Sequence, residues 1–223
     1  MGVETIRAGV DRVDLPQALA GPTCSMYLGD MGADVIKIER PGVGDMSRRK
    51  GPFPGDVPHP EQSFQFLYLN TNKRSVTLDV HRPPGMDVLR RMVKDADVLI
   101  TDLLPAEMDE LEFTYEAMAK VNPKLVMVSI TPFGHTGPYR DMKSTDIVQY
   151  AISSFMNLSG SPDREPLQHA LGQAGFMAAR NAVVAAMGAL LYRGASGEGQ
   201  FIDVSIVESI AVQPPFQPSQ YSY

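Results

Sequence analysis

The chain has 223 residues, 43% hydrophobic and 21% charged, which is enough to bury one sizeable core. It carries 20 Lys and Arg against 26 Asp and Glu, a net charge of -6, and this balance argues against a nucleic-acid partner. The single cysteine, Cys24, excludes a disulfide scaffold, and we expect a cytoplasmic protein.

Histidine and cysteine are too few for a metal centre. The four histidines and Cys24 show no metal-ligand spacing, so we expect no metal. No apolar run is expected to form a membrane helix and no leader-like segment opens the chain, so we also expect no membrane partner.

Short apolar runs recur along the first two thirds of the chain and predict buried strands, because they are brief and bounded by turn residues or charges. The predicted strands are 13–15, 35–38, 76–78, 98–100 and 125–130. Helices are predicted between them at 22–31, 83–95 and 115–121. This alternation predicts an α/β fold, a parallel sheet with helices on both faces.

Three further regions have distinct compositions. Residues 41–63 are rich in Pro and Gly and predict a long loop. Residues 144–159 and 175–193 predict helices, and the second is so rich in Ala that it should be buried nearly all round. Residues 201–205 lead into another element, and the Pro-containing 213–223 predicts a linker or extended arm.

Two basic clusters suggest a phosphate-bearing ligand. The first has cations at 37, 40 and 48–50, and the second is Asn72-Lys73-Arg74 before the third predicted strand. Cations in loops at the carboxyl ends of strands face the usual ligand crevice of an open α/β sheet. A solvated rim is the alternative interpretation of each single residue.

Other candidate motifs are weak. The turn after the first predicted strand has only Gly21, so the glycine-rich cradle of a nicotinamide cofactor is missing. His135, in a loop bracketed by glycines, could be an acid or base, but a polar loop residue is the favoured interpretation. Cys24 is interpreted as a packed small hydrophobe.

Several stretches, taken in order, resemble class III CoA-transferases, the formyl-CoA and carnitine CoA-transferase family. They are LAGP at 19–22, LGDMGADVIKIER at 28–40, NTNKRSVTLD at 70–79, DADV at 95–98, NPKL at 122–125, FGHTGPY at 133–139 and GEGQFIDVS at 197–205. Each motif is weak alone, but the ordered set covers nearly the whole chain and matches the N-terminal half of the family.

The resemblance implies a Rossmann-like large domain built from both chain ends, with a small domain between them, in an interlocked dimer. Residues 1–205 would be the CoA-binding part of this large domain, and 206–223 would begin a linker toward a small domain. Members are about twice this long, so the chain would be a fragment or a subunit.

The resemblance also implies which residues bind CoA or acyl-CoA, the substrate that carries the phosphates. These are Gln17 and Ala18 at the first turn, Arg40 and Lys143 as phosphate cations, and Leu78, Asp79, Val80 and His81 along the adenosine. Glu110 stands where the family has an arginine, and an acid there would repel phosphate.

The family's catalytic residue is an aspartate that attacks the acyl-CoA thioester. Its position is occupied by Gly175, and no Asp or Glu occurs from 167 to 197, so we identify no catalytic residue in this chain. We therefore expect a chain that helps to move CoA between carboxylic acids, with the aspartate supplied by a homologous subunit. The partner in the interlocked dimer is expected to be such a subunit or a second copy of this chain.

Three alternatives stay open. The first is an acyl-CoA racemase or isomerase, although Thr145 stands at its histidine position and Gly175 at its aspartate position. The second is an enzyme that uses His135 or Asp146 in place of the missing aspartate. The third is a non-catalytic CoA-binding or interaction protein.

Overall fold

The computed structural model describes residues 11–14, 19–161 and 163–213. One parallel sheet of six strands runs through them in the order β3-β2-β1-β4-β5-β6. The strands are β1 (Asp11–Asp14), β2 (Asp34–Glu39), β3 (Lys73–Thr77), β4 (Val98–Thr101), β5 (Val126–Thr131) and β6 (Gln200–Ser205). This order is that of the classic doubly wound nucleotide-binding sheet, so the predicted α/β fold is confirmed.

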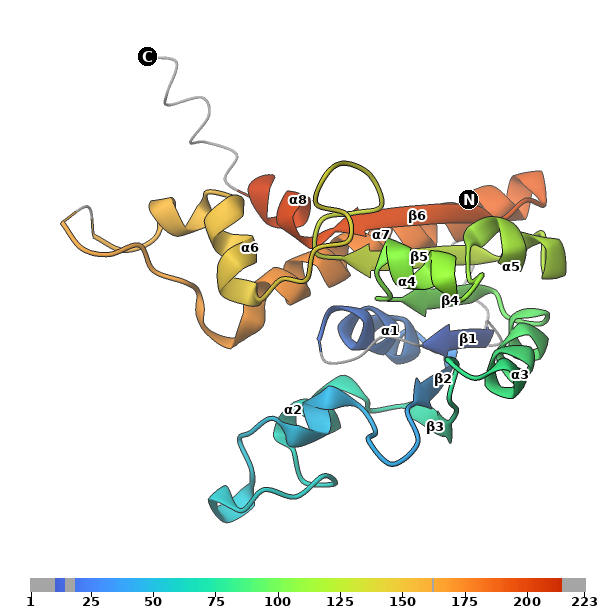
Figure 1. The fold of residues 1–223 in the computed structure, drawn as a ribbon, viewed down its shortest axis with the longest axis horizontal. Helices are drawn as coiled ribbons and strands as arrows, with labels where there is room; N and C mark the ends of the chain where they lie inside the picture. The colour runs from blue at the N-terminus through green and yellow to red at the C-terminus, as the bar shows by residue number, and fades with distance from the viewer. Residues whose placement is uncertain (1–10, 15–18, 162, 214–223) are drawn as a thin grey trace, which may run out of the picture.

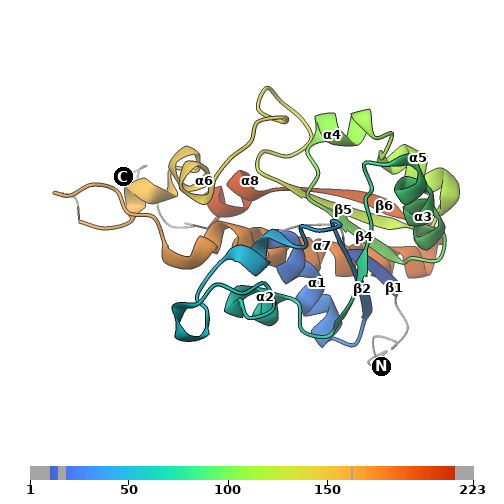
Figure 2. The same cartoon turned by 60° about the horizontal axis from the view of Figure 1, so that its bottom comes forward.

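Helices cover both faces of the sheet (Figures 1 and 2). The helices are α1 (Ala20–Asp30), α2 (Phe64–Leu69), α3 (Pro83–Val93), α4 (Pro105–Glu110), α5 (Tyr115–Val121), α6 (Asp146–Ile152), α7 (Gln173–Ser196) and α8 (Ile206–Ala211). Four short 3-10 turns complete the described elements: η1 (Met46–Arg49), η2 (Pro54–Asp56), η3 (Phe155–Leu158) and η4 (Ala170–Gly172).

Two apolar cores lie on the two faces of the sheet. Alternate residues of β4 separate them, because Val98 and Ile100 pack in the core with α1 and α7, whereas Leu99 packs in the core with α3 and α5. All three side chains are fully buried. The near-continuous apolar character of the central strands follows from this two-sided burial.

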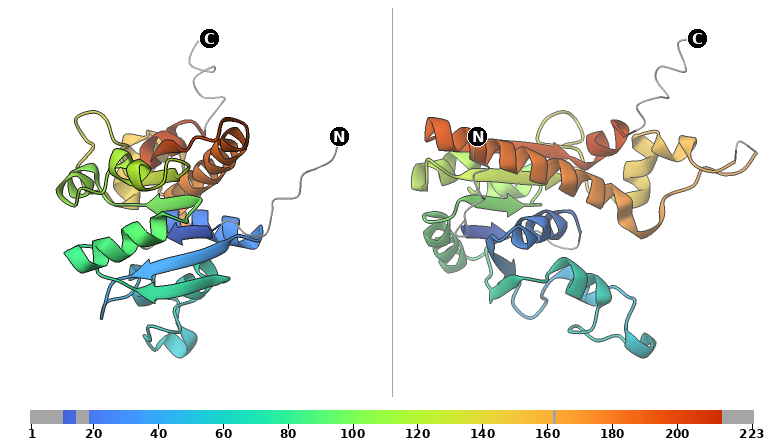
Figure 3. Two further views of the ribbon diagram at one scale, coloured as in Figure 1. Left: turned by 90° about the vertical axis from the view of Figure 1, so that its right-hand side faces the viewer. Right: turned by 180° about the vertical axis from the view of Figure 1, so that it is seen from behind.

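Helix α7 packs lengthwise beside α1 on one face of the sheet (Figure 3). Ala178, Ala182 and Ala186 are fully buried along its length, but the prediction of burial nearly all round is wrong. Its opposite side is open, because Val184 and Leu191 are 72% and 77% exposed. The segment Ala170–Ser196 is long and apolar enough to span a membrane, contrary to the prediction, but here α7 is a helix of the core.

The loop 41–63 forms as predicted but is firmly attached to the sheet. Lys37 Nζ lies 2.7 Å from Asp45 Oδ2, and Arg48 Nε lies 2.7 Å from Glu39 Oε2. The Ser63 hydroxyl donates to the carbonyl oxygens of Ser47 and Lys50. These buried polar contacts fix the loop beside the carboxyl end of β2.

Some predicted elements differ from the structure. The predicted helix 144–159 is divided into α6 and η3, because Ser154 between them adopts a left-handed conformation with φ of 63°. Strand β3 begins at Lys73 rather than at residue 76. Helices α2, α4 and α8, each of six residues, were not predicted.

Helix α8 lies at the start of the segment interpreted as a linker. Its Ile206 is 9% exposed and its Ile210 fully buried, and both belong to the same core as α7. Packing against this core therefore continues at least to Ile210.

Candidate functional site

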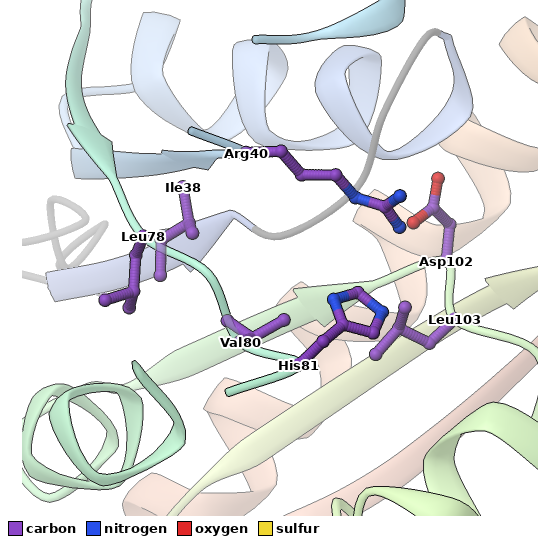
Figure 4. Close-up of a pocket in the computed structure, with 7 residues that line it drawn as sticks. All are labelled: Ile38, Arg40, Leu78, Val80, His81, Asp102 and Leu103. Carbon is purple, nitrogen blue, oxygen red and sulfur yellow. The ribbon is translucent and has the colours of Figure 1, made fainter. Parts of the chain in front are cut away.

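A pocket lies where β2, β3 and β4 end, beside the central strand β1 (Figure 4). Its lining residues are Ile38, Arg40, Leu78, Val80, His81, Asp102 and Leu103. The chain enters β1 at the middle of the sheet and adds strands first on one side and then on the other, so this crevice is the topological switch point, where open α/β sheets bind ligands. Four of the residues assigned to CoA binding from the sequence, Arg40, Leu78, Val80 and His81, meet here.

The stretch from Leu78 to His81 is held in place by the backbone. The Leu78 N–H donates to the Glu39 carbonyl oxygen over 2.9 Å, which extends the contact between β2 and β3 past their ends. A Cβ atom at Gly85, in the first turn of α3, would lie 1.9 Å from the Asp79 carbonyl oxygen. Only glycine allows this close approach of α3 to the pocket wall.

Two carboxylates lie beside Arg40, the cation that lines the pocket (Figure 4). Arg40 extends toward Asp102 in Figure 4, and its Nη2 lies 4.0 Å from Glu107 Oε1. The same Glu107 oxygen lies 2.8 Å from His81 Nε2. Asp102 and Glu107 were not identified from the sequence, because nothing in the spacing of β4 and α4 signals a partner more than sixty positions away.

A second cavity adjoins the first at His81, which lines both, and Glu107 lines the second. It is also lined by Leu104, Ala106, Glu110, Leu111 and Lys143. Lys143 and Glu110 therefore line the same cavity, so the lysine predicted to bind phosphate shares this cavity with an acidic side chain. Among the described residues Lys143 forms no ion pair.

The other predicted binding residues are placed less centrally. Asp79 is absent from the pocket lining, and its Oδ1 lies 3.6 Å from His81 Nδ1 at the rim. Gln17 and Ala18 lie outside the described residues.

Most of the cations in the two basic clusters are structural. Lys37 is only 1% exposed and pairs with Asp45, and Arg48 pairs with Glu39 while its guanidinium stacks 3.6 Å above the Phe66 ring. The interpretation of the second cluster was wrong, because Lys73 and Arg74 lie at the start of β3, at the opposite end of the strands from the pocket.

Gly175 lies in the first turn of α7 with no space beside it. A Cβ atom there would lie 2.8 Å from Leu19 Cδ2 and 3.1 Å from Leu19 Cγ. Leu19 thus covers the place where a side chain at 175 would begin.

The side chain of Asp146, the first residue of α6, lies at the N-terminal end of α7. It accepts a hydrogen bond from the Ala174 N–H and another from the side-chain amide of Gln168. Burial raises the pKa of Asp146 above its ordinary value, and these hydrogen bonds oppose the shift only in part. It thereby satisfies a free N–H of the first turn, a cap that Gly172 cannot provide with a side chain.

His135 is held at the end of β5. Its Nε2 lies 2.7 Å from the Ser129 hydroxyl, and its ring packs edge-on against Phe201. Its backbone N–H donates to a carboxylate oxygen of Asp203. Burial lowers the pKa of His135 and so favours its neutral ring. The contacts account for His135 as a packed loop residue.

The described residues contain no group of three His, Cys, Asp or Glu side chains that could hold a metal ion.

Comparison with known proteins points to one family. The model of CoA-transferase family III matches residues 8–222. The chain is 37% identical over 203 residues to the succinate–glutarate CoA-transferase of Agrobacterium fabrum, covering 90% of this chain and 51% of that protein. It is 37% identical over 204 residues to the formyl-CoA:oxalate CoA-transferase of Afipia carboxidovorans, covering 91% and 46%.

A solved structure shares the fold. A CaiB/BaiF family protein from Brucella suis superposes with a TM-score of 0.88 at 34% identity, over 96% of this chain and 56% of that one. The chain thus spans about half the length of the relatives that it matches.

Proposed function

Since the chain belongs to CoA-transferase family III, we propose that it binds CoA or an acyl-CoA at the carboxyl ends of β2, β3 and β4. The observation that carries the proposal is the meeting of Arg40, Leu78, Val80 and His81, assigned from separate motifs, in one pocket at the switch point. The relatives named as CoA-transferases support the same ligand.

We assign each part of the ligand to residues of matching chemistry. Arg40 and Lys143 offer cations to the phosphates, because charge-assisted hydrogen bonds hold phosphate strongly. Leu78 and Val80 offer apolar surface to the adenine, with Asp79 and His81 beside it. Gln17 and Ala18 remain candidates at the first turn.

We propose that the chain takes part in moving CoA between carboxylic acids but depends on a carboxylate from elsewhere. In such a transfer a carboxylate oxygen bonds to the thioester carbonyl carbon, the C–S bond breaks, and the CoA thiolate leaves. Gly175 has no side chain for this step, and Leu19 covers its position. A homologous subunit that keeps the aspartate would supply the acid, in an interlocked cytoplasmic dimer with this chain.

Asp146 is the internal alternative to that partner, because its carboxylate lies at the same end of α7. The racemase alternative has less support, since Thr145 and Gly175 stand at the positions of its two catalytic residues. The non-catalytic alternative assumes the same CoA pocket, so the hydroxamate test described below is what separates it from the transferase.

Binding is tested first, by calorimetric titration of the purified chain with CoA. We expect saturable binding that weakens about tenfold in Arg40→Gln, because one charge-assisted contact to phosphate is lost. Arg91→Gln, which removes an exposed cation of α3, is the matched control and should bind as the parent does. Absence of CoA binding in the folded parent would refute the proposal.

Chemistry is tested by incubating the chain with succinyl-CoA and hydroxylamine, with and without a family member that keeps the aspartate. Hydroxamate above the protein-free rate is expected only with the partner. Hydroxamate from the lone chain that disappears in Asp146→Asn would favour the internal carboxylate. Binding without hydroxamate in any mixture would leave the non-catalytic alternative.

A further inference from the structure

Glu107 joins three separate segments at the mouth of the pocket. It lies in the first turn of α4, and one carboxylate oxygen, Oε1, faces both His81 Nε2 at 2.8 Å and Arg40 Nη2 at 4.0 Å. Arg40 follows β2 and His81 follows β3, so the carboxylate closes the gap between the two strand ends. An oxygen of a bound phosphate would compete with this carboxylate for the same two groups.

The charges around the pocket are unfavourable for a phosphate. The acids Asp102, Glu107 and Glu110 line the two cavities together with Arg40, Lys143 and His81, and Asp79 at the rim pairs with Arg82. A ligand with several negative charges therefore meets cations that are already offset by acids of the chain itself. Glu107 lies within 4.0 Å of both Arg40 Nη2 and His81 Nε2.

We propose that Glu107 determines the affinity of this site for phosphate: it is an internal counter-ion that a phosphate group must displace from Arg40 and His81. The inference rests on the proposed function, because it presumes that the pocket receives CoA. It predicts that the chain binds CoA more weakly than its cations alone would allow, and that removal of this one acid strengthens binding.

The structure allows such a displacement. The side chains of Glu107 and Arg40 are 35% and 52% exposed, so the carboxylate can turn into water and regain its hydration. Arg40 would keep Asp102 beside it and still present donors to a ligand (Figure 4). The contrasting pair Lys37–Asp45, 1% and 0% exposed, offers no such route.

The test is calorimetric titration with CoA at one fixed salt concentration, using the parent chain and Glu107→Gln. The amide keeps the size of the side chain and can still bond to His81, but it carries no charge. We expect Glu107→Gln to bind CoA about tenfold more tightly, because the phosphate no longer has to break an Arg40–Glu107 ion pair of 4.0 Å in a solvated site. Asp87→Asn, which removes an exposed acid of α3 paired with Arg90, should change affinity less than twofold.

A double substitution separates displacement from simple repulsion. If Glu107 acts by occupying Arg40, most of the gain should vanish when Glu107→Gln is added to Arg40→Gln. An equal or weaker affinity in Glu107→Gln, or a full gain in the Arg40→Gln background, would overturn the inference.

Failure of the proposed function gives a different result. It would leave both the parent and Glu107→Gln without CoA binding. Circular dichroism and urea unfolding confirm that each variant is folded, and Glu107→Ala provides a second variant if the amide destabilises α4.

Discussion

Two glycines of α7 allow the packing at position 175 to be measured. A Cβ added at Gly175 would lie 2.8 Å from Leu19 Cδ2, whereas a Cβ added at Gly188 would meet no atom within 4 Å. Both residues are helical, and neither has a positive φ. The substitutions Gly175→Ala and Gly188→Ala therefore share their chemistry and differ in the space available.

The expected free energies have opposite signs. Gly188→Ala should stabilise the fold by about 0.5–1 kcal/mol, because alanine is the better helix former and restricts the unfolded chain. Gly175→Ala gains less in the first turn and must displace Leu19, an overpacking that costs about 1–3 kcal/mol. Its net effect should be a destabilisation of about 1 kcal/mol, near the lower limit because a leucine end can rotate.

Urea unfolding followed by circular dichroism measures both changes, with equal slopes as the test that the comparison is valid. In a Leu19→Ala background the penalty at 175 should disappear, so that Gly175→Ala becomes neutral or stabilising there. Equal stabilisation by both alanines in the parent chain would refute the view that Leu19 fills the space beside Gly175.

Three further outcomes are expected. Glu39→Gln should lower the free energy of unfolding by about 2–4 kcal/mol. Burial alone would raise the pKa of Glu39, but hydrogen bonds from Arg48 and its neighbours lower this pKa to about 2, so the carboxylate stabilises the fold fully above pH 4.5 and loses this effect as the pH falls toward 2. Acid titration of the unfolding free energy should show this loss in the parent and not in the variant. Gly85→Ala should destabilise the chain by more than about 2 kcal/mol and weaken CoA binding, because its Cβ would lie 1.9 Å from the Asp79 carbonyl oxygen; unchanged urea midpoints would contradict this. Lys143→Ala should weaken CoA binding roughly fivefold by calorimetry while leaving stability within about 0.5 kcal/mol.

The fold could be predicted where burial dictates the pattern. Residues 98–100 and 125–130 are apolar without interruption because both faces of these strands are covered. The edge strand β3 was recognised only from residue 76, since its start, Lys73 and Arg74, is polar and lies against one neighbour. The short helices α2, α4 and α8 span fewer than two turns, too few for a helical period to show.

The candidate site could be predicted in part. Arg40 and His81 were assigned through motifs that resemble a family, and the fold brings them to one pocket. Their acidic neighbour Glu107 escaped notice, because its contact with Arg40 joins residues far apart in sequence and depends on the order of the strands. The basic cluster at 72–74 was misplaced for a different reason: residues that precede a parallel strand lie at its amino end, so these cations lie away from a crevice formed at the carboxyl ends.

The buried alanines of α7 also determine how closely this helix packs against the sheet. Because these side chains are small, the backbone of the 24-residue helix packs close to the sheet along its length. A bulkier residue at Ala182, near the middle of the helix, would push the helix away from the sheet and move its first turn away from Leu19. Substitutions remote from the pocket could thus alter the geometry around position 175, and a screen for variants that open this position should include the middle of the helix.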